Sequence, residues 1–171
     1  MVLWPAVSFS QHWDLFNQER KWLHRESMYC AALFNDMNKF LLITHGHMAS
    51  GMKSSMDILL GNTESLTVFD AYLNEEKVSD HVEAFYASCE EEDLKVLLSD
   101  VYGGSVCQEM TKYADRRNTV VVTGINLGFL MCLLLAGDLD TANIDGYIAE
   151  AKEGMKRIEL ENLAEADEDF F

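Results

Sequence analysis

The strongest constraint on the fold is a fourfold alternation of short apolar runs with longer amphipathic segments, which begins at Asn38. Continuous apolar runs of this length are typical of strands in a parallel sheet, because helices cover both faces of such a sheet and bury every side chain. A segment with apolar residues at helical spacing follows each run, and this order predicts successive βα units. The runs expected to be strands are residues 40–43, 66–69, 94–98 and 119–122.

The predicted fold class is α/β: a doubly wound, mostly parallel sheet of four strands in flavodoxin-like order, with helices on both faces. Apolar residues recur at helical spacing in the first predicted helix, which ends at Gly61: Met48, Met52, Met56, Ile58 and Leu59. A short alternating segment at 156–160 predicts an antiparallel strand near the C-terminus. Further helices are expected at residues 78–89, from Ser105 to about Ala114, and at 127–136 and 144–153.

The chain divides into one predicted domain and two flanking segments. Its 171 residues are enough for one sizeable core, which we assign to residues 37–160. Residues 1–36 hold all three tryptophans and the only proline, but they lack the basic start and apolar core of a secretion signal. We interpret them as a leader or N-terminal extension, with Met37 as a candidate natural start. Residues 161–171 hold five acidic residues and no basic one, which indicates a solvated tail.

Charge and cysteine usage narrow the functional class. The sequence has 29 acidic against 13 basic residues, a formal charge of −16, which disfavours nucleic acid and anionic lipid and favours a basic protein partner. The four cysteines are far apart, with no C-x-x-C pair, so neither a zinc cluster nor a redox motif is indicated. The longest apolar run, residues 127–136, is about half of what a bilayer crossing needs. We therefore expect a cytoplasmic protein.

Residues that could take part in catalysis lie where the predicted strands end. In a parallel sheet the carboxyl ends of the strands line the crevice in which ligands bind. His45 ends the first strand, a position that holds a nucleophile rigidly and leaves it open to a second protein. Asp100 follows the third strand and can accept a hydrogen bond from one ring nitrogen of His45, leaving the other free to attack phosphorus. The alternative role of Asp100 is to cap the following helix or to bind its own loop amides.

Further residues in these turns are candidates for phosphate contacts or support. Gly103, Gly104 and Ser105 open a helix, so they can bring backbone N–H groups and a hydroxyl to a phosphate. His47 is a less favoured acceptor than His45. No histidine spacing resembles a metal site, and no nucleotide-binding glycine loop is present. The supporting residues at this edge are predicted to be Thr44, His47 and Asn126.

From residue 37 to about residue 160 the chain resembles the mannose/sorbose-type enzyme IIA of the phosphoenolpyruvate-dependent sugar phosphotransferase system. Four blocks in the family's order carry the resemblance: Leu42-Ile43-Thr44-His45-Gly46, Ile58-Leu59-Leu60-Gly61, Asp100-Val101-Tyr102-Gly103-Gly104-Ser105 and Thr123-Gly124-Ile125-Asn126-Leu127. The resemblance implies that His45 is phosphorylated, that Asp100 orients it, and that Ser105 and the neighbouring amides hold the phosphoryl group.

The resemblance also implies partners and an assembly. The small phosphocarrier HPr would donate the phosphoryl group, and a separate IIB component would pass it on to sugar entering through a membrane IIC/IID complex. A homodimer is expected, in which residues 156–160 form an exchanged strand, and no cofactor is needed because His45 carries the phosphoryl group covalently. One departure from the family is Val101, where threonine is frequent.

Three other functions remain as alternatives. The phosphotransfer subunit of a dihydroxyacetone kinase shares this fold and a histidine at the same strand end, but the turn from Tyr102 to Ser105 favours the sugar family. A regulatory module without catalytic function would use its histidine only to report phosphorylation to a partner. A flavodoxin-like cofactor binder would use similar architecture.

Overall fold

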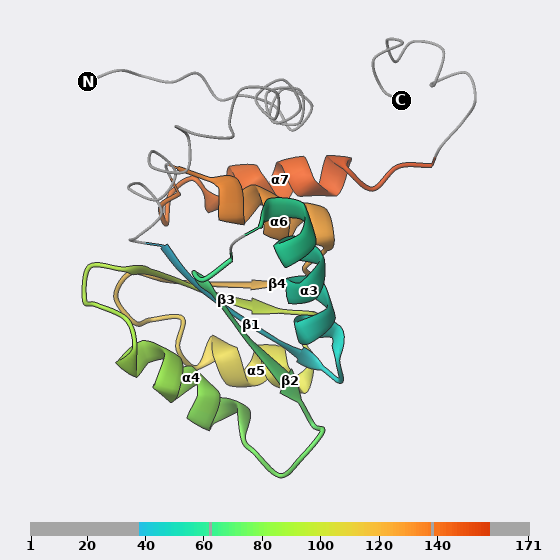
Figure 1. The fold of residues 1–171 in the computed structure, drawn as a ribbon. Coiled ribbons are helices and arrows are strands. Elements are labelled where there is room, and N and C mark those ends of the chain that lie inside the picture. Colours follow the sequence, from blue (N-terminus) through green and yellow to red (C-terminus); the bar gives the residue numbers. More distant parts are fainter. Residues whose placement is uncertain (1–37, 62, 138, 158–171) are drawn as a thin grey trace, which may run out of the picture.

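The computed structural model describes residues 38–61, 63–137 and 139–157 (Figure 1). Four strands form one sheet in the order β2-β1-β3-β4, and all three neighbouring pairs are parallel. This confirms the predicted doubly wound sheet and its flavodoxin-like order. The strands are β1 (Asn38–His45), β2 (Leu66–Ala71), β3 (Leu94–Ser99) and β4 (Thr119–Thr123).

The central strands are rich in consecutive apolar residues because both of their faces are covered. Phe40, Leu41, Leu42 and Ile43 of β1 are fully buried, and every residue of β3 is buried. The edge strand β2 is less completely buried: three of its six residues are buried, Thr67 is exposed, and Val68 and Asp70 are partly buried. The apolar pattern therefore follows each strand's place in the sheet.

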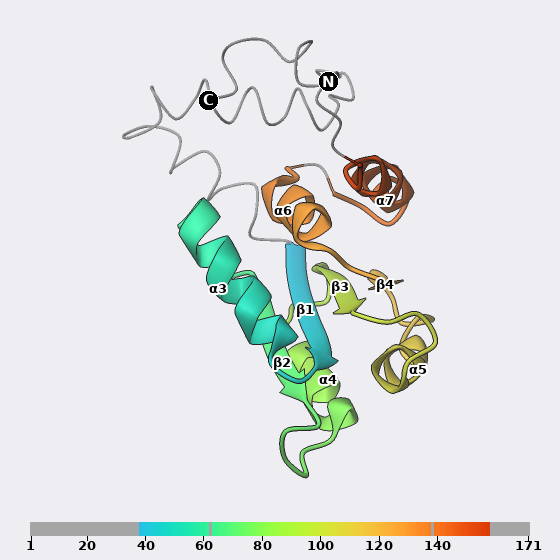
Figure 2. The same ribbon diagram turned by 90° about the vertical axis from the view of Figure 1, so that its right-hand side faces the viewer.

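Helices cover the sheet on both sides (Figure 2). One core joins the sheet to α3 and α6 and extends to α7, and the second joins its other face to α4 and α5. In Figure 1, α7 lies against α6 at the end of the molecule farthest from α4. The helices are α3 (Met48–Leu60), α4 (Val78–Ala87), α5 (Ser105–Thr111), α6 (Leu127–Leu135) and α7 (Ile144–Glu153).

Element ends differ from the predicted ones by a few residues. Strand β1 runs on to His45 because its pairing with β2 continues to the pair His45 and Ala71. Helix α5 stops at Thr111, since residues 112–115 form turns in place of the predicted last helical turn. Lys156 and Arg157 are not in a strand, and residues 158–160 lie outside the described residues, as do the predicted leader and acidic tail.

No helix within the described ranges is long and apolar enough to cross a membrane.

The sheet order fixes where a site can form. Strands β2 and β3 lie on opposite sides of β1, so the chain reverses its direction of winding between β1 and β3. In doubly wound sheets, ligands bind at the carboxyl ends of the strands beside this switch point. His45 and Asp100 follow β1 and β3 there.

Candidate active site

The imidazole of His45 is held by the carboxylate of Asp100. Ring Nδ1 lies 2.9 Å from Asp100 Oδ2, and the backbone N–H of His45 donates to the same oxygen at 2.8 Å. An ionised carboxylate only accepts hydrogen bonds, so Nδ1 must carry the ring hydrogen. The other ring nitrogen, Nε2, then carries no hydrogen and keeps its lone pair, on a side chain that is 42% exposed.

The side chain of Asp100 is only 8% exposed, yet its carboxyl remains ionised. Burial raises the pKa of Asp100, but hydrogen bonds from the backbone and ring of His45 outweigh burial, so the pKa lies below its ordinary value. The second oxygen, Oδ1, accepts from the N–H of Val101 at 2.8 Å. The orienting role and the loop-binding role are therefore both present, on different oxygens.

The turn from Gly103 to Ser105 lies against the free side of the imidazole. Ser105 Oγ is 3.2 Å from His45 Nε2. Gly103 has a φ of +72°, and a Cβ on Gly104 would lie 3.1 Å from the carbonyl oxygen of Val101 and 3.6 Å from His45 Cε1. The N–H of Gly104 donates to that Val101 oxygen at 3.0 Å, so it is not free to bind a phosphate. The contribution of Gly104 is its missing side chain, which lets the turn lie close to the imidazole.

Tyr72 is a fourth residue of this site. It follows β2 directly, and its ring stacks on that of His45 with 5.1 Å between the centroids. Its hydroxyl donates to Ser105 Oγ at 2.6 Å. Tyr72 is not among the predicted site residues, which come from the turns after the first, third and fourth predicted strands. Its position in the sequence could have indicated it, since Tyr72 directly follows a strand that ends at the same edge of the sheet.

His47 forms a separate pair with Asp70. His47 Nδ1 lies 3.2 Å from Asp70 Oδ2, and Ser50 at the start of α3 donates to Asp70 through its backbone N–H at 3.0 Å and its hydroxyl at 2.6 Å. The pKa of Asp70 is lowered because these bonds from Ser50, with help from His47, outweigh the effect of burial. Asp70 therefore ties the beginning of α3 to β2.

Two predicted supporting residues do not contact the imidazole through a described hydrogen bond, and the buried hydroxyl of one of them, Thr44, has no hydrogen-bond partner among the described residues. Thr44 is fully buried, and because it precedes His45 in a strand its side chain points to the opposite face of the sheet. The side chain of Asn126 accepts from the N–H of Phe129 at 2.8 Å and so caps α6. Neither is brought to the imidazole by a described hydrogen bond.

Exposed apolar side chains follow the three strands whose ends form the site. These large apolar side chains are 42 to 87% exposed. Within the described residues, no group of three or more histidine, cysteine, aspartate or glutamate side chains could hold a metal ion. The exposed apolar residues are Met48, Leu73, Val101 and Tyr102.

Comparison with known families accounts for this arrangement. A family model described as PTS system fructose IIA component, EIIA-man, matches residues 39–152, which is more than half of the chain. The chain belongs to this family of IIA components. The resemblance to mannose-type enzyme IIA is thereby confirmed, and a IIA component has a phosphotransfer role in a sugar phosphotransferase system (PTS). No curated protein matches the chain.

Solved structures agree with this assignment. A protein described as a phosphoenolpyruvate-dependent sugar PTS permease from Klebsiella pneumoniae is 25% identical, with a TM-score of 0.65, and the match covers 70% of this chain and 90% of that one. The PTS component EIIA from Streptococcus agalactiae is 22% identical, with a TM-score of 0.61 and coverage of 71% and 97%. The mannose/sorbose-specific IIA subunit from Enterococcus faecalis is 17% identical, with a TM-score of 0.63 and coverage of 72% and 96%. These last two likenesses are evidence of a shared fold alone.

Proposed function

We propose that this IIA component is a phosphocarrier that accepts a phosphoryl group from phospho-HPr on Nε2 of His45 and passes it to a IIB component. The observation that carries the proposal is the pair formed by His45 and Asp100, 2.9 Å apart at the carboxyl edge of a IIA-type sheet. It leaves one ring nitrogen unprotonated and exposed, which is the state that a nucleophile for phosphorus requires.

The transfer itself needs positioning more than covalent chemistry. Nε2 attacks the phosphorus of phospho-HPr, and a new N–P bond forms as the N–P bond to the HPr histidine breaks. The ring of His45 gains positive charge while Nδ1 keeps its hydrogen toward Asp100, whose negative charge stabilises the cation. Ser105 Oγ, 3.2 Å from Nε2, is close enough to donate to an oxygen of the arriving phosphoryl group.

The second transfer repeats these steps in reverse. The IIB component attacks the phosphorus carried by His45, and the ring of His45 leaves as a neutral imidazole. No cofactor is required, because the phosphoryl group is carried covalently between the partners. The membrane IIC/IID complex is reached only through IIB.

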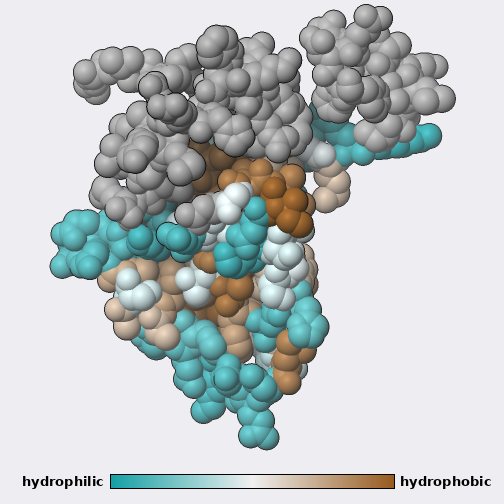
Figure 3. All heavy atoms as spheres, in the orientation of Figure 1, coloured by the Kyte–Doolittle hydropathy of each residue, from teal (hydrophilic) through white to brown (hydrophobic). Residues whose placement is uncertain are grey.

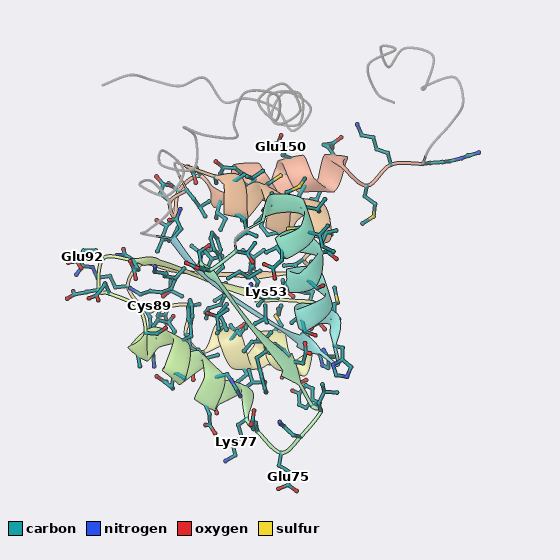
Figure 4. The ribbon with its side chains drawn as sticks, viewed as in Figure 1. Lys53, Glu75, Lys77, Cys89, Glu92 and Glu150 are labelled. Carbon is teal, nitrogen blue, oxygen red and sulfur yellow. The ribbon has the colours of Figure 1, made fainter. Side chains whose placement is uncertain are left out.

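The surface around His45 suits protein partners. The exposed Met48, Leu73, Val101 and Tyr102 offer apolar contact area around a small reactive centre. Figure 4 shows Glu75 at the tip of the loop after β2, pointing away from the molecule, and Figure 3 shows that hydrophilic residues dominate this end. A partner with basic residues around an apolar centre would fit. We propose a cytoplasmic location, and the homodimer with an exchanged C-terminal strand remains a prediction.

The test is phosphorylation from phosphoenolpyruvate, enzyme I and HPr, followed by mass spectrometry under conditions that preserve acid-labile phosphate. The wild type should carry one phosphate on the peptide that contains residues 44–48. His45→Ala should carry none, while the matched variant His47→Ala should be labelled like the wild type. Label that persists in His45→Ala would refute the assignment.

Adding IIB to the labelled protein separates carrier from sensor. A carrier should lose its label to IIB, whereas a regulatory module would retain it. Transfer to a dihydroxyacetone kinase instead of IIB would favour the kinase alternative.

A further inference from the structure

Tyr72 contacts the proposed phosphoryl site, but the mechanism above gives it no role. Its hydroxyl lies 2.6 Å from Ser105 Oγ, and its ring flanks the imidazole of His45. Tyr72 comes from the end of β2 and Ser105 from the start of α5, so the contact joins two elements on either side of β1. A contact of this kind fixes the loops around the reacting nitrogen relative to one another.

The hydrogens along this chain of contacts can be assigned. Because Nδ1 of His45 donates to Asp100, Nε2 can only accept while the ring is neutral. Ser105 is therefore the donor in its 3.2 Å contact with Nε2. The Ser105 oxygen in turn accepts from the Tyr72 hydroxyl. The hydrogen bonds therefore run in one direction, from the Tyr72 hydroxyl to Ser105 Oγ and from the Ser105 hydroxyl to His45 Nε2.

The backbone of Tyr72 is held in an unfavourable conformation. Its φ is +65°, and Asn118 is the one other non-glycine residue with a positive φ among those that the structure describes. Asparagine tolerates this region, whereas a bulky aromatic residue rarely adopts it. The N–H of Gly46 donates to the carbonyl of Ala71 at 3.1 Å, which ties the end of β2 to the loop after His45. Strained residues of this kind cluster at functional sites.

We propose that Tyr72 is a positioning residue for phosphoryl transfer: its hydroxyl, by donating to Ser105 Oγ, turns the Ser105 hydrogen toward Nε2 of His45 and the phosphoryl group there. Without the Tyr72 donor, the Ser105 hydroxyl can rotate freely among acceptors. With it, the oxygen of Ser105 is occupied and its hydrogen points at the reacting atom. Donation by Tyr72 also polarises Ser105, which strengthens the bond that Ser105 gives. The inference rests on the proposed function.

The test compares Tyr72→Phe with Tyr86→Phe. Tyr72→Phe keeps the aromatic ring and removes only the hydroxyl. The hydroxyl of Tyr86 on α4 lies 2.8 Å from Thr119 Oγ1 at the start of β4, which is the edge of the sheet opposite the site, so Tyr86→Phe is a matched control for the loss of one tyrosine hydroxyl and its hydrogen bond. The maximal rate of labelling from phospho-HPr should fall about 3- to 10-fold in Tyr72→Phe, the effect of one hydrogen bond, and should stay at the wild-type value in Tyr86→Phe.

A double-mutant cycle tests whether Tyr72 acts through Ser105. Ser105→Ala should be slower than wild type, and adding Tyr72→Phe to it should slow transfer no further, because the hydroxyl that Tyr72 directs is already gone. The half-saturating concentration of phospho-HPr should be the same in all variants. Additive losses, or a change confined to that concentration, would overturn the proposal in favour of direct contact with phosphate or partner.

A measurement without HPr separates this inference from the proposed function. The ¹⁵N resonance of His45 Nε2 should move in Tyr72→Phe and in Ser105→Ala, because both change the hydrogen bond that Nε2 accepts, and should not move in Tyr86→Phe. If the wild type takes no label, the proposed function fails. If the wild type is labelled but Tyr72→Phe matches it in rate and resonance, only the role of Tyr72 is refuted.

Discussion

The backbone N–H and the ring Nδ1 of His45 donate to one and the same oxygen, Oδ2 of Asp100, at 2.8 and 2.9 Å. A side chain tied through both its backbone and its ring has little freedom to rotate. The carboxylate therefore sets the position of the imidazole as well as its tautomer. It can also stabilise the positive charge that the ring gains when Nε2 bonds to phosphorus.

Replacing Asp100 by asparagine should separate charge from geometry. An amide oxygen can still accept from His45, so the fold should survive, but the negative charge opposite the ring is lost. We expect the rate of phosphorylation from phospho-HPr to fall about 100-fold or more, the range of a well-placed acid–base group. Rapid-quench labelling measures the rate, and circular dichroism checks the fold.

The matched control is Asp70→Asn, which makes the same change in the pair formed by Asp70 and His47. Its labelling rate should remain within about threefold of the wild type, an effect no larger than one weak hydrogen bond. An equal loss of labelling rate in Asp100→Asn and Asp70→Asn would mean that the overall negative charge of this region, and not the orientation of His45, governs transfer.

Asp70→Asn should instead affect stability, and in a pH-dependent way. The pKa of Asp70 is lower in the folded state than in the unfolded state, so the carboxylate stabilises the fold above its ordinary pKa of about 3.9. This contribution is lost as pH falls through the lower, folded-state pKa. At pH 7 the free energy of unfolding of the wild type should exceed that of the variant by about 1 kcal/mol, the cost of losing a helix cap. This difference should shrink below about pH 4.

Urea unfolding at pH 7, 5 and 3 measures this difference. Equal differences at pH 7 and 5 are expected, because the carboxyl is ionised in both states at both values. A difference that grows on acidification would contradict the assigned direction of the pKa shift.

Much of this architecture was predictable because it follows from local apolar pattern. The buried centre of β1 is a continuous apolar run, β3 is an apolar run interrupted by Lys95, and their carboxyl ends had to meet at one edge of a parallel sheet. His45, Asp100 and Ser105 therefore come together at this edge whichever helix covers which face of the sheet.

The position of Tyr72 after a strand at this edge was predictable, but its contact with His45 was not, because that contact depends on details that the local sequence does not encode. Its ring reaches His45 only because β2 lies beside β1 and its own φ is positive. Likewise, the sequence is compatible with an Asn126 side chain that points to the site or caps its own helix. In the structure it caps α6, because the N–H of Phe129 donates to it. The N–H of Gly104 likewise donates to Val101 within its own turn, a detail of backbone geometry that the sequence pattern does not specify.

Gly104→Ala should slow transfer with little effect on stability. The new Cβ would lie 3.1 Å from the Val101 carbonyl oxygen and 3.6 Å from His45 Cε1, so the turn that carries Ser105 must shift. Displacement of a positioning group by a fraction of an ångström should cost about 10-fold in rate. Labelling kinetics from phospho-HPr measure the loss.

Gly51→Ala is the matched control within α3. A Cβ there meets nothing within 4 Å, and alanine favours the helix, so the free energy of unfolding should rise by about 0.5 to 1 kcal/mol with the transfer rate unchanged. A slower Gly51→Ala variant would show that added methyl groups disturb the site from a distance.

Cys132 should resist alkylation in the folded protein. It lies within α6, where burial, and then the charge of Glu150, raises the pKa of its thiol to about 11. Only the thiolate reacts, and each unit of pKa above the ordinary value of about 8.5 reduces the thiolate fraction about tenfold. Iodoacetamide at pH 8 should therefore modify Cys132 more than about 100 times more slowly in the native than in the urea-unfolded chain, as followed by peptide mass spectrometry.

Glu150→Gln distinguishes the two causes of this protection. Figure 4 shows Glu150 on α7, the helix that packs against α6. Removing its charge should speed alkylation of Cys132, but the rate should stay far below that of the unfolded chain, because burial is the larger cause. If the variant reacts as fast as the unfolded chain, the charge of Glu150 dominates and the packing of α6 against α7 does little to shield the thiol.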